Sequence, residues 1–136
     1  EGFSDARALL AGIMVLQGQP FRSYETAAAE FKVFSQFYES RSHMEGFPLI
    51  VISDNAVFAA KNTENLLWTT FTRSNPSHDI YGIDSFSHHK HWGCHGPLVI
   101  DARTKHHHAP SLIPDQGVKK KVDALLLRHE ILRKWS

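Results

Sequence analysis

The fold is decided by a short apolar stretch near the middle of the chain, Phe47-Pro48-Leu49-Ile50-Val51-Ile52. Gly46 precedes this run, and Asp54-Asn55 closes it. A run of this length that is rich in β-branched residues and lacks polar alternation is typical of a strand buried on both faces. Such a strand is usually central in a sheet that helices cover on either side. The stretch therefore predicts an α/β domain.

Helical and strand patterns extend outward from this segment. Apolar spacing predicts helices from Ser4 to about Leu16, over about residues 26–42, from Asn62 or Thr63 to Arg73, and after Asp115 to Trp135. Short strands are expected at Ile80-Tyr81 and Leu98–Ile100, and the His-rich residues 84–97 show the pattern of a loop. The order predicts one layered α/β domain over residues 1–136, with a small, mostly parallel or mixed sheet flanked by helices and a long C-terminal helix.

Composition narrows the class of protein. The chain has 136 residues, is 42% hydrophobic and carries a formal charge of +1, so it is neither a disordered chain nor an evident nucleic-acid binder. No apolar run is long enough to span a membrane. The single Cys94 excludes an internal disulfide framework, and no signal peptide is visible, so a cytoplasmic location is expected. Because the chain begins at Glu1 rather than Met, we expect a fragment of a longer protein.

Histidine is concentrated in one part of the chain. Eight of the ten histidines lie between His78 and His108. Imidazole and thiolate are good zinc ligands, so an autonomous metal-binding or protein-interaction domain is one interpretation. The spacing lacks the paired Cys and His motifs of zinc fingers, which favours hydrogen bonding, packing and pocket lining, and no metal site is predicted. The candidate ligands are His88, His89, His91, Cys94, His95, His106, His107 and His108.

Three further groups of residues each allow a functional and a structural interpretation. Cys94 could be a nucleophile activated by a neighbouring imidazole, as in a cysteine hydrolase, or a small residue between two glycines in a tight loop. Asp54-Asn55 and Asp101 each follow a buried strand, where α/β sheets bind ligands, but they could also be turn or helix-cap acceptors. The run Lys119–Lys121 could bind an anion or form a solvated helix face. The glycine-rich phosphate-binding motifs are absent from the sequence.

Three ordered segments resemble the C-terminal domain of UbiD-family decarboxylases. Leu67–Asp79 resembles that family's Leu-Trp-x-x-x-Thr-Arg-x-Asp-Pro-x-x-Asp stretch. Leu49–Asp54 looks like its apolar strand with an acidic end, and Leu98–Lys105 is similar to its Gly-Leu-Asp-Ala-Thr-x-Lys segment. A Lys-Val-Asp-Ala helix follows at residues 121–124, and the resemblance covers roughly residues 47–135.

The resemblance implies one domain of a large decarboxylase that acts on aromatic or α,β-unsaturated acids, such as polyprenyl-hydroxybenzoate in ubiquinone biosynthesis. In that family an upstream domain of the same chain binds prenylated FMN with a divalent metal and potassium, and carries a catalytic Glu-Arg-Glu set. This chain lacks the Glu-Asn-Leu-Arg type of sequence, so no catalytic residue is transferred and the fragment alone is expected to be inactive. Its implied role is to assemble subunits and close the substrate pocket.

The resemblance also suggests a few site residues. A family lysine that helps to hold the flavin has no counterpart here, and Arg41 or His43 could supply the charge, although a surface position near a helix end is the favoured interpretation. His91 and Trp92 are candidates for the wall of the substrate pocket. The apolar face of the last helix, with Leu126, Leu132 and Trp135, is expected to dock on a neighbouring subunit of a homo-oligomer.

Overall fold

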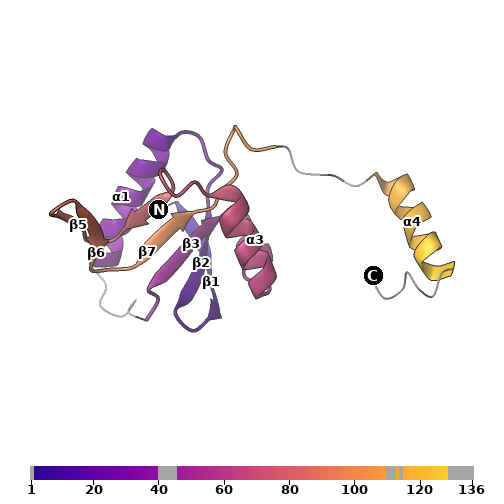
Figure 1. Ribbon diagram of the computed structural model, residues 1–136, viewed down its shortest axis with the longest axis horizontal. Coiled ribbons are helices and arrows are strands. Elements are labelled where there is room, and N and C mark those ends of the chain that lie inside the picture. The colour runs from indigo at the N-terminus through magenta and orange to yellow at the C-terminus, as the bar shows by residue number, and fades with distance from the viewer. Residues whose placement is uncertain (1, 40–45, 110–112, 114, 129–136) are drawn as a thin grey trace.

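A five-stranded mixed sheet forms the centre of the structure, a computed structural model that describes residues 2–39, 46–109, 113 and 115–128 (Figure 1). The elements follow in the order β1 (Phe3–Leu10), β2 (Ile13–Gly18), α1 (Tyr24–Glu39), β3 (Leu49–Ser53), α2 (Ala56–Ala59), α3 (Thr63–Arg73), β4 (Ile80–Gly82), β5 (Ser85–His88), β6 (His91–Cys94), β7 (Leu98–Asp101) and α4 (Gln116–Arg128). The predicted α/β class, with helices on both sides of a mixed sheet and a C-terminal helix, is confirmed.

The strand predicted to be central is central. The sheet order is β1-β2-β3-β7-β4, with β3 parallel to both β2 and β7, while the edge strands β1 and β4 run antiparallel to their neighbours. Ile50 and Val51 are fully buried, and Ile52 is nearly so. Since adjacent side chains of a strand point to opposite faces, a strand covered on both sides needs this continuous apolar run.

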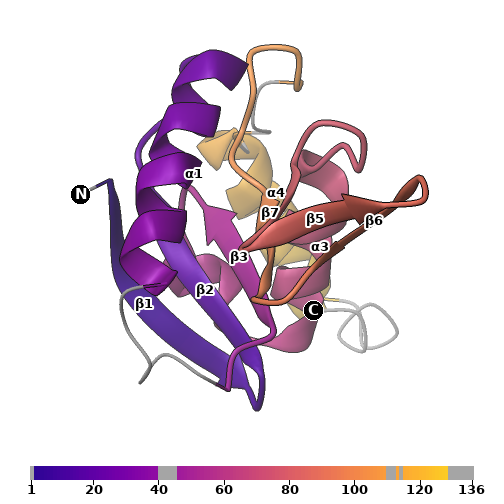
Figure 2. The same cartoon turned by 90° about the vertical axis from the view of Figure 1, so that its left-hand side faces the viewer.

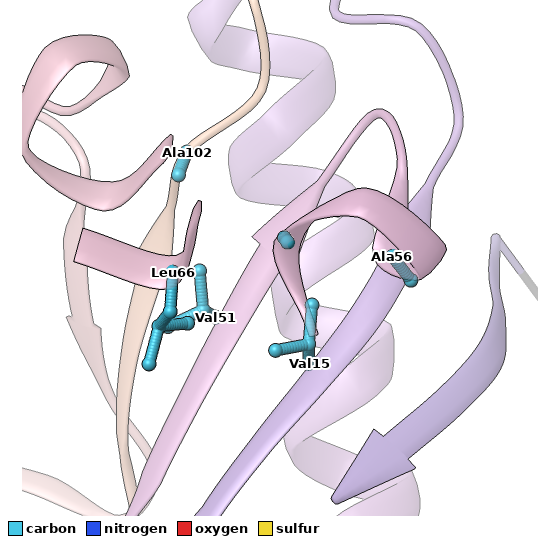
Figure 3. Packing of buried hydrophobic residues seen from close by; sticks show 6 residues of the cluster. Val15, Val51, Ala56, Leu66 and Ala102 are labelled. Atoms are coloured by element: carbon cyan, nitrogen blue, oxygen red, sulfur yellow. The ribbon is translucent and has the colours of Figure 1, made fainter. Parts of the chain in front are cut away.

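Two hydrophobic clusters fill the two faces of the sheet. Figure 3 shows Val15 and Val51 pointing toward the side where Ala56 of α2 and Leu66 of α3 lie. On the other face Ile50 and Phe34 belong to the cluster beneath α1. The pattern predicts a helix over residues 26–42, and the structure confirms a helix over Tyr24–Glu39, while residues 40–42 lie outside the described residues.

The helix predicted from Ser4 to Leu16 is wrong, because this segment forms the antiparallel pair β1–β2. Gly12 has a φ of +86° in the turn between the two strands, a conformation that favours glycine. Val15 and Leu16 point to opposite faces and both are buried, so β2 is apolar on both sides. An apolar run without alternation cannot be distinguished from a helix by its periodicity alone.

Residues 84–97, expected to be a loop, contain the hairpin β5–β6. His89 and Lys90 form its two-residue turn, and both have positive φ. Hairpin turns with this backbone usually carry Asn-Gly or Asp-Gly, so the sequence lacked the usual signal. Figure 2 shows the hairpin extending away from the five-stranded sheet.

The expected starts of two later helices are confirmed. The side chain of Asn62 accepts a hydrogen bond from the Asn65 amide at 2.8 Å and caps α3. Asp115 caps α4 by accepting from the Val118 amide at 2.9 Å. Leu132 and Trp135 lie outside the described residues. None of the described helices combines the length and the apolar character that crossing a membrane requires.

Candidate functional site: a buried ion network

Charged side chains are buried at the carboxyl end of β7. Asp101, Arg103 and Lys105 alternate with Ala102 and Thr104, and each of the three charged residues is at most 2% exposed. Charged groups are rarely buried unless they are paired. Together with Asp79 and Glu30, these three residues form what we call the buried ion network.

The sheet topology brings the members of this network together. β4 pairs antiparallel with β7, and the Asp101 amide donates to the Asp79 carbonyl at 2.8 Å just beyond the β4–β7 ladder. Glu30 comes from α1, which covers one face of the sheet. Residues from α1, from the segment before β4 and from the end of β7 therefore meet at the carboxyl end of β7.

Arg103 joins three elements. Its Nε and Nη2 atoms donate to the two carboxylate oxygens of Asp101 at 3.0 and 2.7 Å. Its Nη1 atom donates to Glu30 Oε2 at 2.8 Å and to the carbonyl of Gln19 at 2.9 Å. Gly18 makes room for this arrangement, since a Cβ there would lie 2.8 Å from Arg103 Cδ. The guanidinium thus ties β7 to α1 and to the end of β2.

Electrostatics keep this guanidinium charged. Burial alone would lower the pKa of Arg103, but hydrogen bonds and Coulomb attraction from Asp101 and Glu30 outweigh burial and raise it above its ordinary value. The fork geometry of arginine suits two-point binding of a carboxylate, as Asp101 shows.

Lys105 occupies the other side of Asp101. Its Nζ atom donates to the carbonyl of Asp101 and, at 3.0 Å, to that of Arg73. Lys105 Nζ also lies 3.3 Å from Asp79 Oδ1. Among the described residues, Asp79 Oδ1 accepts no hydrogen bond, so this ion pair compensates its burial. Asp79 Oδ2 accepts from the Asn75 amide at 2.6 Å. Lys105 therefore fixes the segment that connects α3 to β4.

A second polar cluster follows β3. Asp54 Oδ2 accepts from the amide and hydroxyl of Thr104 at 2.7 and 2.8 Å and from Arg73 Nη1 at 3.3 Å. The next residue, Asn55, caps α2 by accepting from the Phe58 amide at 2.9 Å. Of the two interpretations left open for Asp54-Asn55, the structure supports turn and cap acceptors.

Aromatic rings cover the network on the side of α1. The Phe21 ring lies 5.7 Å from the guanidinium of Arg103 and 5.6 Å from the ammonium of Lys105, measured to the ring centroid. Phe21 also packs edge-on against Tyr24 at 5.2 Å. Burial, followed by the carboxylates of Asp79 and Asp101, raises the pKa of Tyr24. The Phe21 ring thus covers both cations of the network on this side.

The ion pairs join α1, the segment before β4 and the end of β7, and we call this arrangement a structural clamp. Each buried cation faces a buried carboxylate, so neither Arg103 nor Lys105 is available to bind a phosphate. Such pairs are weak evidence for net stability, but breaking one leaves an unpaired buried charge and is costly. We therefore assign the network a role in fixing the geometry of the carboxyl edge rather than in proton transfer or cofactor binding.

The predicted site residues do not belong to this network. Arg41 and His43 lie outside the described residues. His91 and Trp92 lie on β6, where both are exposed, and the edge of the Trp92 ring lies over Gly82. Cys94 packs against Gly82 as well, and the neighbouring His95 imidazole is engaged with Asp84 at 2.9 Å. Within the described ranges no three His, Cys, Asp or Glu side chains are arranged to hold a metal ion.

Sequence reasoning missed the roles of Glu30, Arg103 and Lys105. A signal was present for two of them: Asp101, Arg103 and Lys105 follow an apolar strand at spacing i, i+2, i+4, which is the period of one face of an extended chain. Glu30 carried no signal, because its partner is remote in sequence. The segments that resembled a known family supplied Arg73, Asp79, Asp101 and Lys105, and all four meet here.

Comparison with known proteins gives two kinds of similarity. No protein-family model matches the chain. Over 84 residues the chain is 31% identical to a subunit of the 4-hydroxybenzoate decarboxylase of Chlamydia pneumoniae, an alignment that covers 58% of this chain and 14% of the relative. An uncharacterized protein of Chlamydia muridarum is also 31% identical over 84 residues, covering 61% of this chain and 14% of that protein. The chain thus spans about a seventh of the length of these relatives.

A solved structure has a similar fold. It is the vanillic acid decarboxylase of Sedimentibacter hydroxybenzoicus in its open form, with a TM-score of 0.52 and 18% identity over 85% of this chain and 27% of that one. At this identity the likeness concerns the fold alone. The chain is therefore related in sequence, over part of its length, to a 4-hydroxybenzoate decarboxylase subunit and shares its fold with part of a vanillic acid decarboxylase.

Proposed function

We propose that the chain is the C-terminal domain of a UbiD-type decarboxylase, in which it assembles subunits and closes the substrate pocket. The observation that carries the proposal is that two of the family-like segments supply members of the buried ion network, while the third is joined to it through Arg73. Arg73 and Asp79 come from one segment, Asp101 and Lys105 from another, and Asp54 from the third contacts Arg73. The similarity to a decarboxylase subunit over 84 residues supports the same assignment.

The proposed substrates are aromatic carboxylic acids. The two named relatives are decarboxylases of 4-hydroxybenzoate and of vanillic acid, so a hydroxylated benzoate is the first class to test. A polyprenyl-hydroxybenzoate, the ubiquinone precursor that the family resemblance suggests, is the second. The Chlamydia pneumoniae relative is itself one subunit of its decarboxylase, so a further partner subunit belongs to the proposal as well.

Prenylated FMN is proposed as the cofactor of the whole enzyme, held by a part of the protein other than this domain. A phosphate-binding site needs unpaired donors or cations, and the two buried cations here are both committed to carboxylates. Arg103 and Lys105 are therefore not proposed as contacts of the flavin phosphate. Arg41 and His43 keep their proposed role only as additional contacts.

The test uses the full-length protein that contains this chain, produced with prenylated FMN supplied. We expect release of CO₂ from 4-hydroxybenzoate, vanillate or a polyprenyl-hydroxybenzoate, and exchange of labelled bicarbonate into the same acid. The 136-residue chain alone should show neither reaction. Absence of both reactions with all three acids, from a folded and flavin-loaded protein, would contradict the proposal, and so would a gene product without any flavin-binding part.

A further inference from the structure

A cavity of about 310 Å³ lies between α1 and the strand pair β1–β2. Figure 2 shows α1 passing over these two strands at one side of the sheet. An apolar cavity of roughly 150 Å³ is large enough to hold benzene, so this one has room for a substituted ring. Nine residues line it, namely Phe3, Ser4, Asp5, Ala6, Met14, Leu16, Val33, Phe34 and Phe37.

The walls of this cavity are apolar and reach the surface. Leu16 and Phe34 are buried and form its floor, and the Phe3 ring packs edge-on against the Phe34 ring at 5.3 Å between centroids. Val33 and Phe37 on α1 are 51 and 45% exposed, so they lie at the mouth. Because aromatic rings pack edge-on or offset against one another, walls of this kind favour a flat aromatic ligand.

The polar side of the cavity comes from an irregularity in β1. Between the pairs Ser4–Gln17 and Arg7–Val15, β1 has two residues where β2 has one, which is a β-bulge. Asp5 lies in this bulge with a φ of +44°, an uncommon conformation for a residue with a Cβ. Arg7 Nε lies 3.0 Å from Asp5 Oδ1 and helps to hold the carboxylate in place. Bulges and backbone strain of this kind are concentrated beside binding sites.

The charge of the lining distinguishes between aromatic ligands. Among the nine lining residues, Ser4 and Asp5 have the hydrogen-bonding side chains, and none of the nine is cationic. An ionised carboxylate accepts hydrogen bonds and donates none, so a ligand hydroxyl finds an acceptor in Asp5. The carboxylate of a benzoate would meet either the like charge of Asp5 or the apolar floor, whichever end of the molecule enters first.

We propose that this cavity binds a neutral single-ring phenol, with the hydroxyl donating to Asp5, and that it rejects the corresponding benzoate. When a hydroxybenzoate loses CO₂ and a proton takes the place of the carboxylate on the ring, the product is such a phenol. In that one respect the inference rests on the proposed function, since the cavity would then hold the product of the reaction and not its substrate. The binding itself does not depend on that function.

The experiment titrates the full 136-residue chain with phenol and, separately, with 4-hydroxybenzoate, and follows the methyl groups by NMR. We expect saturable shifts of the methyl signals of Met14, Leu16 and Val33 on addition of phenol, because these residues line the cavity. The affinity for phenol should be at least about fivefold higher than that for 4-hydroxybenzoate, given the repulsion between two nearby carboxylates.

Three variants test the site. Ala6→Trp places a large ring in the lining and should weaken phenol binding at least about tenfold. Ala8→Trp is the matched control, because it makes the same change two residues along β1 and outside the lining, and it should keep the affinity within about twofold. Asp5→Asn keeps an acceptor and a residue that tolerates positive φ, so phenol should still bind, but the preference over 4-hydroxybenzoate should fall to within about twofold.

Three results would overturn the inference. They are the absence of saturable shifts at these methyl groups with millimolar phenol, equal affinities for phenol and 4-hydroxybenzoate, and phenol binding that Ala6→Trp leaves unchanged. Circular dichroism verifies the folding of each variant, and if Ala6→Trp does not fold, the methyl shifts of the natural chain decide.

Calorimetry extends the test to the full-length protein that contains this chain. Phenol binding there should be lost in Ala6→Trp and kept in Ala8→Trp. Equal binding in these two variants would show that another part of the protein fills the cavity, and would overturn the inference as well. None of these readouts depends on decarboxylase activity, so the proposed function can fail or hold separately.

Discussion

Lys105 Nζ lies 3.3 Å from Asp79 Oδ1, although strands β4 to β7 lie between the two residues in the sequence. Both side chains are almost completely buried. The pair joins the loop after β7 to the segment after α3, and it shares Asp101 with Arg103. Asp79, Lys105, Asp101 and Arg103 therefore form a chain of ion pairs at the carboxyl end of β7, and removing one residue leaves its partner unpaired.

Replacing Lys105 by Met should destabilise the domain by about 3–5 kcal/mol, because Asp79 and Asp101 would remain buried without this cation. Urea unfolding followed by circular dichroism measures the loss. Lys119→Met is the matched control, since Lys119 pairs with Asp123 on the exposed side of α4 and should cost at most about 0.5 kcal/mol. Equal losses in the two variants would show that the buried pair is not a clamp.

Arg103→Lys should also destabilise, by roughly 2–4 kcal/mol, even though the charge is kept. A single ammonium cannot donate at once to both Asp101 oxygens, Glu30 and the Gln19 carbonyl, as the guanidinium does. Glu30→Gln is the comparison and should cost less, because Glu30 is 20% exposed and water can replace its contact. If the Arg103→Lys protein is as stable as the natural one, the two-point contact between the guanidinium and Asp101 does not contribute to stability.

His108 should make stability depend on pH. Burial, followed by repulsion from the neighbouring His107 and Lys105, lowers the pKa of His108 below 6.5. Its Nδ1 atom accepts a hydrogen bond from the Lys105 amide at 3.0 Å, which requires that atom to be unprotonated. The unfolded chain therefore binds this proton at a higher pH than the folded chain does. The contribution of neutral His108 to the free energy of unfolding is complete above about pH 6.5 and is lost as the pH falls through the folded pKa.

Two measurements check this pH dependence. An NMR titration of the His108 ring should give a lower pKa in the folded chain than in urea. His108→Gln, which keeps an acceptor but does not titrate, should show a shallower loss of unfolding free energy between about pH 7 and 5. A folded pKa at or above the value in urea would reverse the sign and reject the argument.

The turn of the β5–β6 hairpin should accept a stabilising change. His89 and Lys90 have φ values of +48° and +67°, and Lys90→Gly removes the Cβ penalty at the second position. We expect a gain of about 0.5–1 kcal/mol and a higher Tm. The same substitution at Lys120, inside α4, should lower the local helix content instead. No change in Tm for Lys90→Gly would mean that the turn is not strained in solution.

His91 and Trp92 remain proposed pocket-wall residues. In the full-length protein, if it is the proposed decarboxylase and these residues contact the substrate, Trp92→Ala and His91→Ala should lower kcat/KM by about tenfold through KM. His89→Ala, at the exposed turn of the same hairpin, is the control and should leave kcat/KM unchanged. If both variants keep the kcat/KM of the natural protein, His91 and Trp92 do not line the substrate pocket.

Several elements could be predicted because their signals are local. The buried strand β3 needs a continuous apolar run, the amphipathic pattern of α1 needs only its own residues, and the Asn62 cap is visible beside its helix. The β1–β2 hairpin could not be predicted in this way. Its second strand is buried on both faces because α2 and α3 cover one side and α1 covers the other, and these helices come later in the chain. The β5–β6 hairpin has a turn without the usual turn residues.

Local sequence patterns predicted the class of domain, the central strand and the three segments that resemble a decarboxylase family, because burial, capping and motif spacing each depend on neighbouring residues. The closed network of Glu30, Asp79, Asp101, Arg103 and Lys105 is visible only in three dimensions. Its charges pair because Glu30 and Asp79, which are remote from β7 in the sequence, become its neighbours in space.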